Sequence, residues 1–384
     1  MHPSNQLSSL GRYTLLCIAS LTVMVGALVA PGLLSIANGL GVNGSPTWLM
    51  TLPSLGAVVC APIAGKVIDR YGAYSCLIIG LFLYGAIGAF VFVLYGPIPV
   101  FINRFALGGV TAIVMASGTV LISEWYTDKE RLGMMAQQGM AIELGGVIFL
   151  FLGGQLAVQH WGLPLSLYLA GWVFLAMLLF FVPRHSPQFE DESKGDGSAA
   201  LTLNYFSLKK VYLCTTLAML VFFSCMVVLP IAMHQQGYRE EQVGYLLALI
   251  SSMAVVSALF MPRLERRLGQ AGLLISAFAL YAFAYWCFGQ ASLWVLVLGA
   301  LFVGTGFGFS IPLLNHMTVE RSPAAVRGRN LSYFTMAIFS GQFLTSFIEL
   351  IPGDINNVFI ACMGAASLVA LLLLISRFQQ KGNP

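Results

Sequence analysis

Long apolar runs recur along almost the whole chain, and they constrain its fold more than any other feature. Many of them reach the roughly 20 residues that a helix needs to cross the hydrocarbon core of a bilayer. In that core each backbone N–H and C=O group needs a partner within the protein, which leaves helices or a closed β-barrel. Barrel strands have about ten residues with strict alternation, whereas these runs are longer and uniformly apolar. The sequence therefore predicts an all-α membrane protein.

The composition agrees with this prediction. Charged residues make up 9% of the 384 residues and hydrophobic residues 58%, whereas soluble domains carry about 25% charged residues. So few charges cannot cover a surface that faces water on all sides. We expect twelve transmembrane helices, at 13–35, 47–68, 75–95, 98–123, 133–157, 163–182, 209–233, 241–262, 271–289, 292–316, 328–351 and 355–377.

A long polar stretch divides the predicted helices into two sets of six. It is acidic in its middle and rich in Gly and Ser, a composition typical of flexible linkers. We therefore expect two pseudo-symmetric six-helix bundles, formed by residues 1–183 and 209–384 and joined by a cytoplasmic linker at 184–208.

The basic residues are distributed unevenly between the predicted loops. If both termini and the linker are cytoplasmic, all of the 19 basic residues except Arg104 and Arg239 lie in cytoplasmic segments or at their edges. The positive-inside rule expects this asymmetry, and an error of one helix in the count would destroy it. We expect a multi-pass protein of the plasma membrane, specifically a bacterial inner membrane, with both termini cytoplasmic.

Landmark residues of the first half recur in the second half at a nearly constant separation. The pairs are Pro31 and Pro230, 199 residues apart; Gly72 and Gly269, 197 apart; and Glu124 and Glu320, Arg131 and Arg327, and Gly145 and Gly341, each 196 apart. Matches in the same order at one separation indicate duplication of a six-helix unit. Parallel six-helix repeats of this kind occur in one large class of transporters.

The loop after the second predicted helix carries the most specific motif. It reads Gly65-Lys-Val-Ile-Asp69-Arg70-Tyr-Gly72. A glycine there lets helices approach closely, and Asp and Arg at a helix end interact with a neighbouring helix dipole and across the loop. The loop resembles the signature of the major facilitator superfamily, in which a glycine is followed four residues later by Asp-Arg-x-Gly. The alternative interpretation is an ordinary charged turn.

The resemblance extends over the whole chain and implies secondary active transport by alternating access. In this family the loop motif locks the cytoplasmic side in the outward-open state. The family usually has a basic residue directly after the last glycine, where this chain has Ala73-Tyr74, so we expect Glu124 to pair with Arg70 or Arg131 instead. The expected gate residues are Gly65, Asp69, Arg70, Gly72, Glu124 and Arg131.

Arg104 lies inside the fourth predicted helix, in a segment Arg104-Phe-Ala-Leu-Gly108. The segment resembles the Arg-x-x-x-Gly element of proton-coupled family members, which implies a part in proton coupling. An arginine within the membrane is costly and is expected to face a cavity and a partner. Gly108, Thr111 and Met115 follow on the same helical face, and we predict that they line the substrate cavity. In the alternative interpretation, Arg104 extends to the outer interface.

Glu143 is the most deeply placed acidic residue, about ten residues past the start of the fifth predicted helix. At about 1.5 Å per residue this places it near the bilayer midplane. Acidic side chains at that depth carry protons in many transporters, and we expect Glu143 to take part in proton coupling. The alternative is a structural carboxylate tied to Arg104 or to a backbone group.

The fifth helix also contains Gly145-Gly146 and Gly153-Gly154. These partly resemble the antiporter motif of family exporters, but Phe149-Leu150 stands where the family has Gly-Pro. Close packing of helices is the alternative explanation for the glycines.

In the eleventh predicted helix, Thr335, Gln342, Thr345 and Glu349 lie near one face. We predict that Gln342, Thr345 and Glu349 line the substrate cavity from the second bundle.

These residues favour a proton-coupled exporter of small amphipathic molecules, such as drugs or metabolites including siderophores. The alternative is proton-coupled uptake or facilitated transport of a small organic acid or nutrient. The five His and seven Cys are scattered without catalytic or C-x-x-C spacing, and no G-x-x-x-x-G-K-[ST] loop occurs. We therefore expect no enzyme activity, no metal, no cofactor and no nucleic acid. The expected partners are the substrate, protons and the lipid bilayer, and the expected unit is a monomer.

Overall fold

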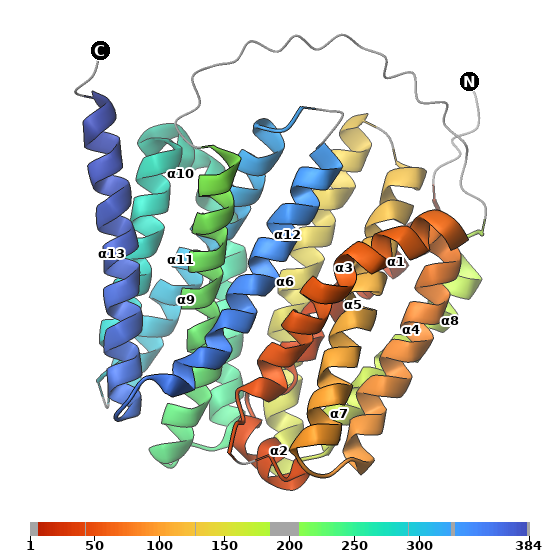
Figure 1. Cartoon of the computed structure of the whole chain (residues 1–384), viewed down its shortest axis with the longest axis horizontal. Helices are drawn as coiled ribbons and strands as arrows, with labels where there is room; N and C mark the ends of the chain where they lie inside the picture. The colour runs from red at the N-terminus through yellow and green to blue at the C-terminus, as the bar shows by residue number, and fades with distance from the viewer. Residues whose placement is uncertain are drawn as a thin grey trace.

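The computed structural model describes residues 7–42, 44–126, 128–184, 207–290, 292–323 and 327–381. All regular secondary structure in these ranges is helical, and the long helices run roughly parallel to one another (Figure 1). The all-α prediction is confirmed.

The first half of the chain folds into six membrane crossings, three of them composed of more than one element. The elements are α1 (Ser9–Ala27), α2 (Leu33–Leu40), α3 (Trp48–Tyr71), α4 (Ala73–Phe90), η1 (Val91–Val93), α5 (Pro97–Trp125), α6 (Asp128–Gln159), α7 (Leu163–Ser166), η2 (Leu167–Leu169) and α8 (Ala170–Phe181). We call this half the N bundle.

The second half, the C bundle, repeats this order. Its elements are α9 (Leu208–Gln235), α10 (Glu240–Phe288), α11 (Leu293–Glu320), α12 (Arg327–Leu344), η4 (Thr345–Leu350) and α13 (Ile355–Lys381). Among the described residues, 11 helices are long and apolar enough to cross a membrane. The 49-residue α10 turns at Gly269, where φ is 72° and ψ is 164°, and so supplies two crossings. The predicted twelve-helix, two-bundle fold is therefore confirmed.

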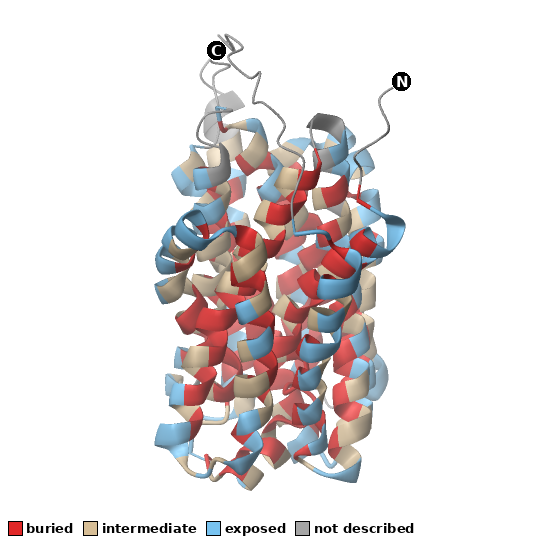
Figure 2. Cartoon of the chain, turned by 90° about the vertical axis from the view of Figure 1, so that its right-hand side faces the viewer, coloured by how far each residue is buried: buried red, intermediate tan, exposed pale blue. Residues whose placement is uncertain are grey.

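Both ends of the described chain lie at the same end of the molecule, which we call the terminal end (Figure 1). The opposite end carries α2 and α7. Buried residues fill the interior, while many outward-facing residues are exposed (Figure 2). Large apolar side chains are among them, with Phe180 at 83% and Trp294 at 82% exposure. Such a surface suits lipid rather than water.

The sequence repeat is visible in the backbone and in the packing. Gly72 and Gly269 both have a positive φ, 81° and 72°, with extended ψ, a combination that only glycine adopts without strain. Gly145 packs on α1, where a Cβ atom would lie 2.6 Å from the Ser20 Cβ. Its counterpart Gly341 packs on α9, where a Cβ atom would lie 2.4 Å from the Thr216 backbone oxygen.

A pair of buried tyrosines repeats as well. The Tyr84 hydroxyl on α4 donates a hydrogen bond of 2.7 Å to the backbone oxygen of Leu21 on α1. The Tyr285 hydroxyl on α10 donates to the backbone oxygen of Val221 on α9. Both pairs link the third crossing of a bundle to its first crossing, so the two halves share their internal contacts and not only their helix count.

Candidate functional site between the two bundles

Polar side chains join the two bundles toward the opposite end. Ser54 on α3 donates a hydrogen bond of 2.7 Å to Gln342 on α12. One turn nearer the opposite end, the Ser346 hydroxyl lies 2.6 Å from the Thr51 hydroxyl. The segments α3 and α12 therefore form one seam between the bundles, held by hydroxyl and amide groups.

The second seam joins α6 and α10 through glycines. A Cβ atom on Gly154 would lie 2.8 Å from the Glu240 backbone oxygen, and one on Gly244 would lie 2.9 Å from the Leu150 backbone oxygen. Gly146 faces Ser251 on the same seam. Only glycine permits backbones to approach this closely.

The neighbouring glycines of the same motif face α1 instead. Cβ atoms on Gly145 and Gly153 would lie 2.6 Å from the Ser20 Cβ and 2.7 Å from the Leu28 backbone oxygen. Gly145, Gly153 and Gly154 of the exporter-like motif thus lie at close helix contacts, as the packing alternative expects.

At the terminal end, contacts between described residues connect helices of the same bundle. Arg12 on α1 donates a hydrogen bond of 2.9 Å to Gln137 on α6. The Tyr212 hydroxyl on α9 donates one of 3.1 Å to the Asn330 backbone oxygen on α12. Cβ atoms on Gly118 and Gly139 would meet nothing within 4 Å. The contacts that join the two bundles among the described residues therefore lie toward the opposite end.

Glu143 lies where the α6 seam ends. It shares one face of α6 with Gly146, Leu150 and Gly154, which are three, seven and eleven residues further along. Gly146 is the last of them to meet α10, and Gly139, one turn beyond Glu143, faces open space. The Glu143 side chain is half-buried.

Arg104 is fully buried, at 0% exposure, so the alternative in which it extends to the outer interface is wrong. Its Nη1 donates a hydrogen bond of 2.9 Å to the Tyr168 hydroxyl, and its guanidinium carbon lies 5.4 Å from the centroid of that ring. Both Arg104 and Glu143 are described residues, and no ion pair joins them.

The structure corrects part of the predicted cavity on α5. A Cβ atom on Gly108 would lie 1.8 Å from the Pro53 backbone oxygen, so Gly108 lies at the contact of α5 with α3 and not in a cavity wall. Thr111 is buried and donates a hydrogen bond of 2.7 Å to the Leu107 backbone oxygen of its own helix. Met115, nearer the terminal end, is half-buried and stays a cavity candidate.

The structure does not group the three cavity residues predicted on the second bundle at one cavity wall. Gln342 belongs to the seam through its bond with Ser54. Thr345 is buried at 0% exposure, with a hydrogen bond of 3.3 Å to the Gly341 backbone oxygen, and so lines no cavity in this conformation. The side chain of Glu349 lies outside the described part of the structure.

The predicted gate loop is disengaged in this conformation. Gly65, Asp69, Arg70 and Gly72 are all exposed. The Arg70 guanidinium carbon lies 5.4 Å from the ring centroid of the adjacent Tyr71.

The two remaining gate residues are Glu124, near the end of α5, and Arg131, near the start of α6. Glu124 interacts with a neighbouring group, and the side chain of Arg131 lies outside the described residues. The expected pairing of Glu124 with Arg70 or Arg131 therefore stays a prediction.

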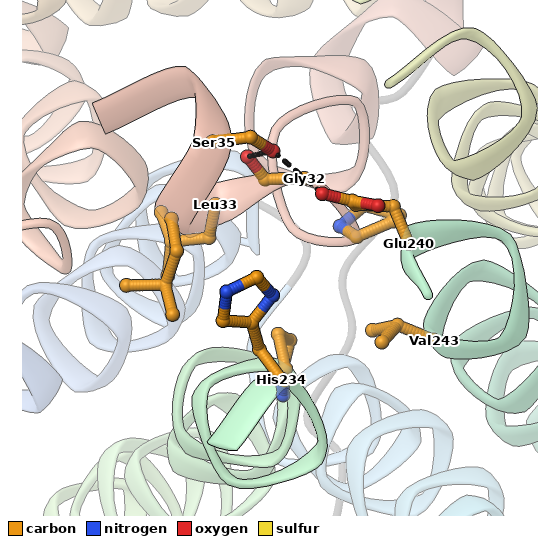
Figure 3. A pocket seen from close by; sticks show the side chains of 9 residues that line it. Gly32, Leu33, Ser35, His234, Glu240 and Val243 are labelled. Atoms are coloured by element: carbon orange, nitrogen blue, oxygen red, sulfur yellow. Dashed lines mark hydrogen bonds between the residues drawn. The ribbon is translucent and has the colours of Figure 1, made fainter. Parts of the chain in front are cut away.

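Sequence reasoning missed a small pocket at the opposite end, where the bundles meet (Figure 3). Its cavity volume is about 10 Å³, room for about one water molecule. The Ser35 hydroxyl of α2 donates a hydrogen bond of 3.0 Å to the Glu240 carboxylate of α10, and the His234 ring faces the same space. The lining residues are Pro31, Gly32, Leu33, Leu34, Ser35, Pro230, His234, Glu240 and Val243. The signal in the sequence that could have indicated this pocket is the repeated pair Pro31 and Pro230, since both prolines line it.

Several curated proteins are similar to parts of this chain. Multidrug resistance protein 1 of Bacillus subtilis (strain 168) is 29% identical over 170 residues, which cover 44% of this chain and 43% of the relative. A triacylglyceride transporter of Mycobacterium tuberculosis (strain ATCC 25618 / H37Rv) is 26% identical over 149 residues, 36% of this chain and 29% of that protein. The matched region spans less than half the length of these curated relatives.

Solved structures share the fold over nearly the whole chain. A POT family transporter in complex with a thioalcohol-conjugated peptide aligns with a TM-score of 0.78 and 14% identity, covering 97% of both chains. A D-xylose–proton symporter aligns with a TM-score of 0.72 and 17% identity, covering 95% of both chains. At such identities the likeness shows the fold alone. The family model of the Major Facilitator Superfamily matches residues 15–346, so this chain belongs to that superfamily of transporters.

Proposed function

We propose that this transporter is a proton-coupled exporter of small amphipathic molecules, with Glu143 as the coupling carboxyl. The observation that carries the proposal is the position of Glu143 on α6, between Gly146, which meets the C bundle, and Gly139, which meets nothing within 4 Å. The inter-bundle contacts of α6 end beside this carboxyl, so it would be enclosed if the bundles also closed at the terminal end.

The physical basis of coupling is the cost of enclosing a charge. An ionised carboxylate that loses water without gaining a partner is strongly disfavoured. Closure over Glu143 is therefore favoured when the carboxyl carries a proton or when a cationic group of the substrate neutralises it. If proton and substrate exclude each other at Glu143, inward movement of one drives outward movement of the other.

The proposed direction depends on orientation in the membrane. Of the 19 basic residues, all but Arg104 and Arg239 belong to the terminal end or to segments that connect there, which supports a cytoplasmic terminal end. The present conformation would then receive substrate from the cytoplasm. The bundles at 1–183 and 209–384 would move about each other as units, and most of the linker at 184–208 lies outside the described residues.

The substrate class rests on chemistry and on the names of relatives. The half-buried cavity candidate on α5, Met115, is apolar. Relatives named for multidrug resistance and for triacylglyceride transport support amphipathic, largely apolar substrates.

Uptake of an organic acid is less well supported. That alternative needs Arg104 to bind the substrate carboxylate. Arg104 has 0% exposure and donates to Tyr168, so no carboxylate can reach it in this conformation.

The test is transport by the purified protein in liposomes under an imposed proton gradient. Amphipathic cations, neutral drugs, metal-chelating metabolites and organic acids would each be offered from either side. Proton-gradient-driven accumulation of amphipathic molecules should be lost in Glu143→Gln and persist in the matched control Glu241→Gln, a half-buried acid at the opposite end that pairs with Arg239. Movement of organic acids alone, in the same direction as protons, would replace export by uptake.

A further inference from the structure

The first crossing of the N bundle is broken, and its counterpart in the C bundle is not. Helix α1 ends at Ala27, four residues before Pro31, and α2 starts at Leu33. Helix α9 continues through Pro230 to Gln235. Both crossings have proline at the equivalent position, so the proline does not by itself explain the break.

The break begins at the backbone oxygen of Val25. In a regular helix the Val29 amide would donate to it. Here the Val29 amide donates to the Gly26 oxygen instead, at 3.2 Å, and shares it with the regular helical bond from Ala30 at 3.1 Å. The Val25 oxygen thereby loses its helical partner in a buried place, where an unpaired carbonyl is unfavourable.

A side chain from another crossing replaces that partner. The Tyr168 hydroxyl donates a hydrogen bond of 3.0 Å to the Val25 oxygen. Arg104 Nη1 in turn donates to the Tyr168 hydroxyl at 2.9 Å, and the Arg104 and Tyr168 side chains are both at 0% exposure. A cationic donor polarises the phenol and strengthens the bond that the phenol donates.

The C bundle lacks this arginine. At the separation of 196 residues found in the repeat, Gly304 is equivalent to Gly108 and Ala300 is equivalent to Arg104. The packing agrees, since a Cβ atom on Gly304 would lie 2.4 Å from the Ile250 backbone oxygen of α10, just as Gly108 packs against α3. Ala300 has no group that could donate a hydrogen bond from its side chain.

The other tyrosine contact does not distinguish the bundles. The bonds from Tyr84 and Tyr285 to the first crossing are present in the N bundle and in the C bundle alike. The arginine and its partner Tyr168 therefore mark the difference between the broken and the unbroken crossing.

The break has a consequence at the opposite end. Because α1 stops at Ala27, α2 turns toward the C bundle, where its Ser35 hydroxyl donates to Glu240. The same segment, Pro31–Ser35, forms one wall of the pocket whose other wall contains Pro230 and His234 (Figure 3).

We propose that Arg104 is a positioning residue that, through Tyr168 and the Val25 oxygen, keeps α1 broken and seats α2 in the closed contact at the opposite end. This role goes beyond the proposed coupling at Glu143 and does not depend on it. Without the Tyr168 hydroxyl, the Val25 oxygen regains a partner only if α1 continues as a regular helix, as α9 does.

The test is the distance between spin labels on α2 and α9, measured on the full chain in lipid nanodiscs. Asn38 and Gln235 are exposed and suit labelling after substitution by cysteine. The seven native cysteines, all buried or half-buried, would be replaced first. The parent should give one narrow distance distribution.

Tyr168→Phe and Arg104→Met should each shift this distance by more than the rise of one helical residue, about 1.5 Å. The double variant should shift it no further than Arg104→Met alone, because both act on one chain of bonds. Arg104→Lys, which keeps a cationic donor, should restore most of the parent distribution. The matched control Tyr285→Phe, which removes the tyrosine hydroxyl that contacts the first crossing of the C bundle, should leave it unchanged.

Two outcomes would overturn the proposal. One is an unchanged distance in Tyr168→Phe and Arg104→Met at a thermal stability that shows a folded protein. The other is a shift in Gly26→Ala but not in Tyr168→Phe, which would assign the break to glycine flexibility. A Cβ atom on Gly26 would lie 3.4 Å from Phe223, an ordinary contact, so this variant fits. Slower amide exchange between α1 and α2 in Tyr168→Phe, as a continuous helix would give, would support the proposal without labels.

Discussion

Ser54 donates a hydrogen bond of 2.7 Å to Gln342, and the residues equivalent to this pair are Ser251 and Gly146. Ser251 follows Ser54 by 197 residues, and Gln342 follows Gly146 by 196, the same separations as in the sequence repeat. Gly146 and Ser251 also face each other. The two seams between the bundles are therefore symmetric in position and different in chemistry, with hydrogen bonds in one and glycine contacts in the other.

The hydrogen-bonded seam should open more easily when Ser54 or Gln342 loses its polar group. One neutral hydrogen bond contributes about 0.5–1.5 kcal/mol, so Ser54→Ala should raise the population open at the opposite end by roughly twofold to tenfold. Single-molecule energy transfer between dyes on α3 and α12 at that end would measure it. Ser276→Ala, which removes a bond within α10 only, is the matched control, and an equal population in both variants would contradict the role of the seam.

The glycine seam should be blocked by a larger side chain. In Gly154→Leu the new side chain would meet the Glu240 backbone oxygen and Gly244, so the present conformation should be lost in favour of one open at the opposite end. Thiol-reagent access to a cysteine at Ser35 would report the change. Gly364→Leu, where a Cβ atom meets nothing within 4 Å, should behave like the parent. If the cysteine at Ser35 stays inaccessible to the thiol reagent in both Gly154→Leu and Gly364→Leu, the glycine seam tolerates a larger side chain and the prediction is wrong.

Gly108 should matter for stability rather than for substrate choice. A Cβ atom there would lie 1.8 Å from the Pro53 backbone oxygen, and overpacking of a tight contact costs about 1–3 kcal/mol. Gly108→Ala should lower the melting temperature of the detergent-solubilised protein. Gly133→Ala, which faces open space, serves as control. A normal melting temperature combined with altered substrate preference would return Gly108 to the cavity wall.

The gate loop should act only when the terminal end closes. Asp69 and Arg70 are exposed in this conformation, so Asp69→Asn should leave the melting temperature unchanged while slowing transport. Initial transport rates and melting curves on the same preparation would measure both effects. An unaffected rate would favour the ordinary charged turn that the sequence also allows.

The helix count and the repeat followed from the sequence because both depend on local patterns. Apolar length gives each crossing, and Gly72 and Gly269 recur where only glycine fits the backbone. The sequence did not, however, predict how short these two connections are: Gly72 alone separates α3 from α4, and Gly269 is the non-helical residue inside α10.

The site was less predictable because its contacts join residues far apart in the chain. The face shared by Arg104, Gly108 and Thr111 is real, but it turns toward α3 and Tyr168 rather than toward a cavity. Helical periodicity predicts on which face of its helix a residue lies, but not which other helix packs against that face. Tyr168 and Glu240 carried no local signal, since their roles arise from partners 64 and 205 residues away.

The most direct test of coupling at Glu143 is proton movement caused by substrate. Liposomes containing the transporter and a trapped pH dye would receive an amphipathic cation without any imposed gradient. We expect a substrate-dependent pH change with the parent and with Glu241→Gln, and none with Glu143→Gln, although Glu143→Gln still exchanges substrate across the membrane. A pH change of parent size in Glu143→Gln would contradict the assignment of Glu143 as the coupling carboxyl.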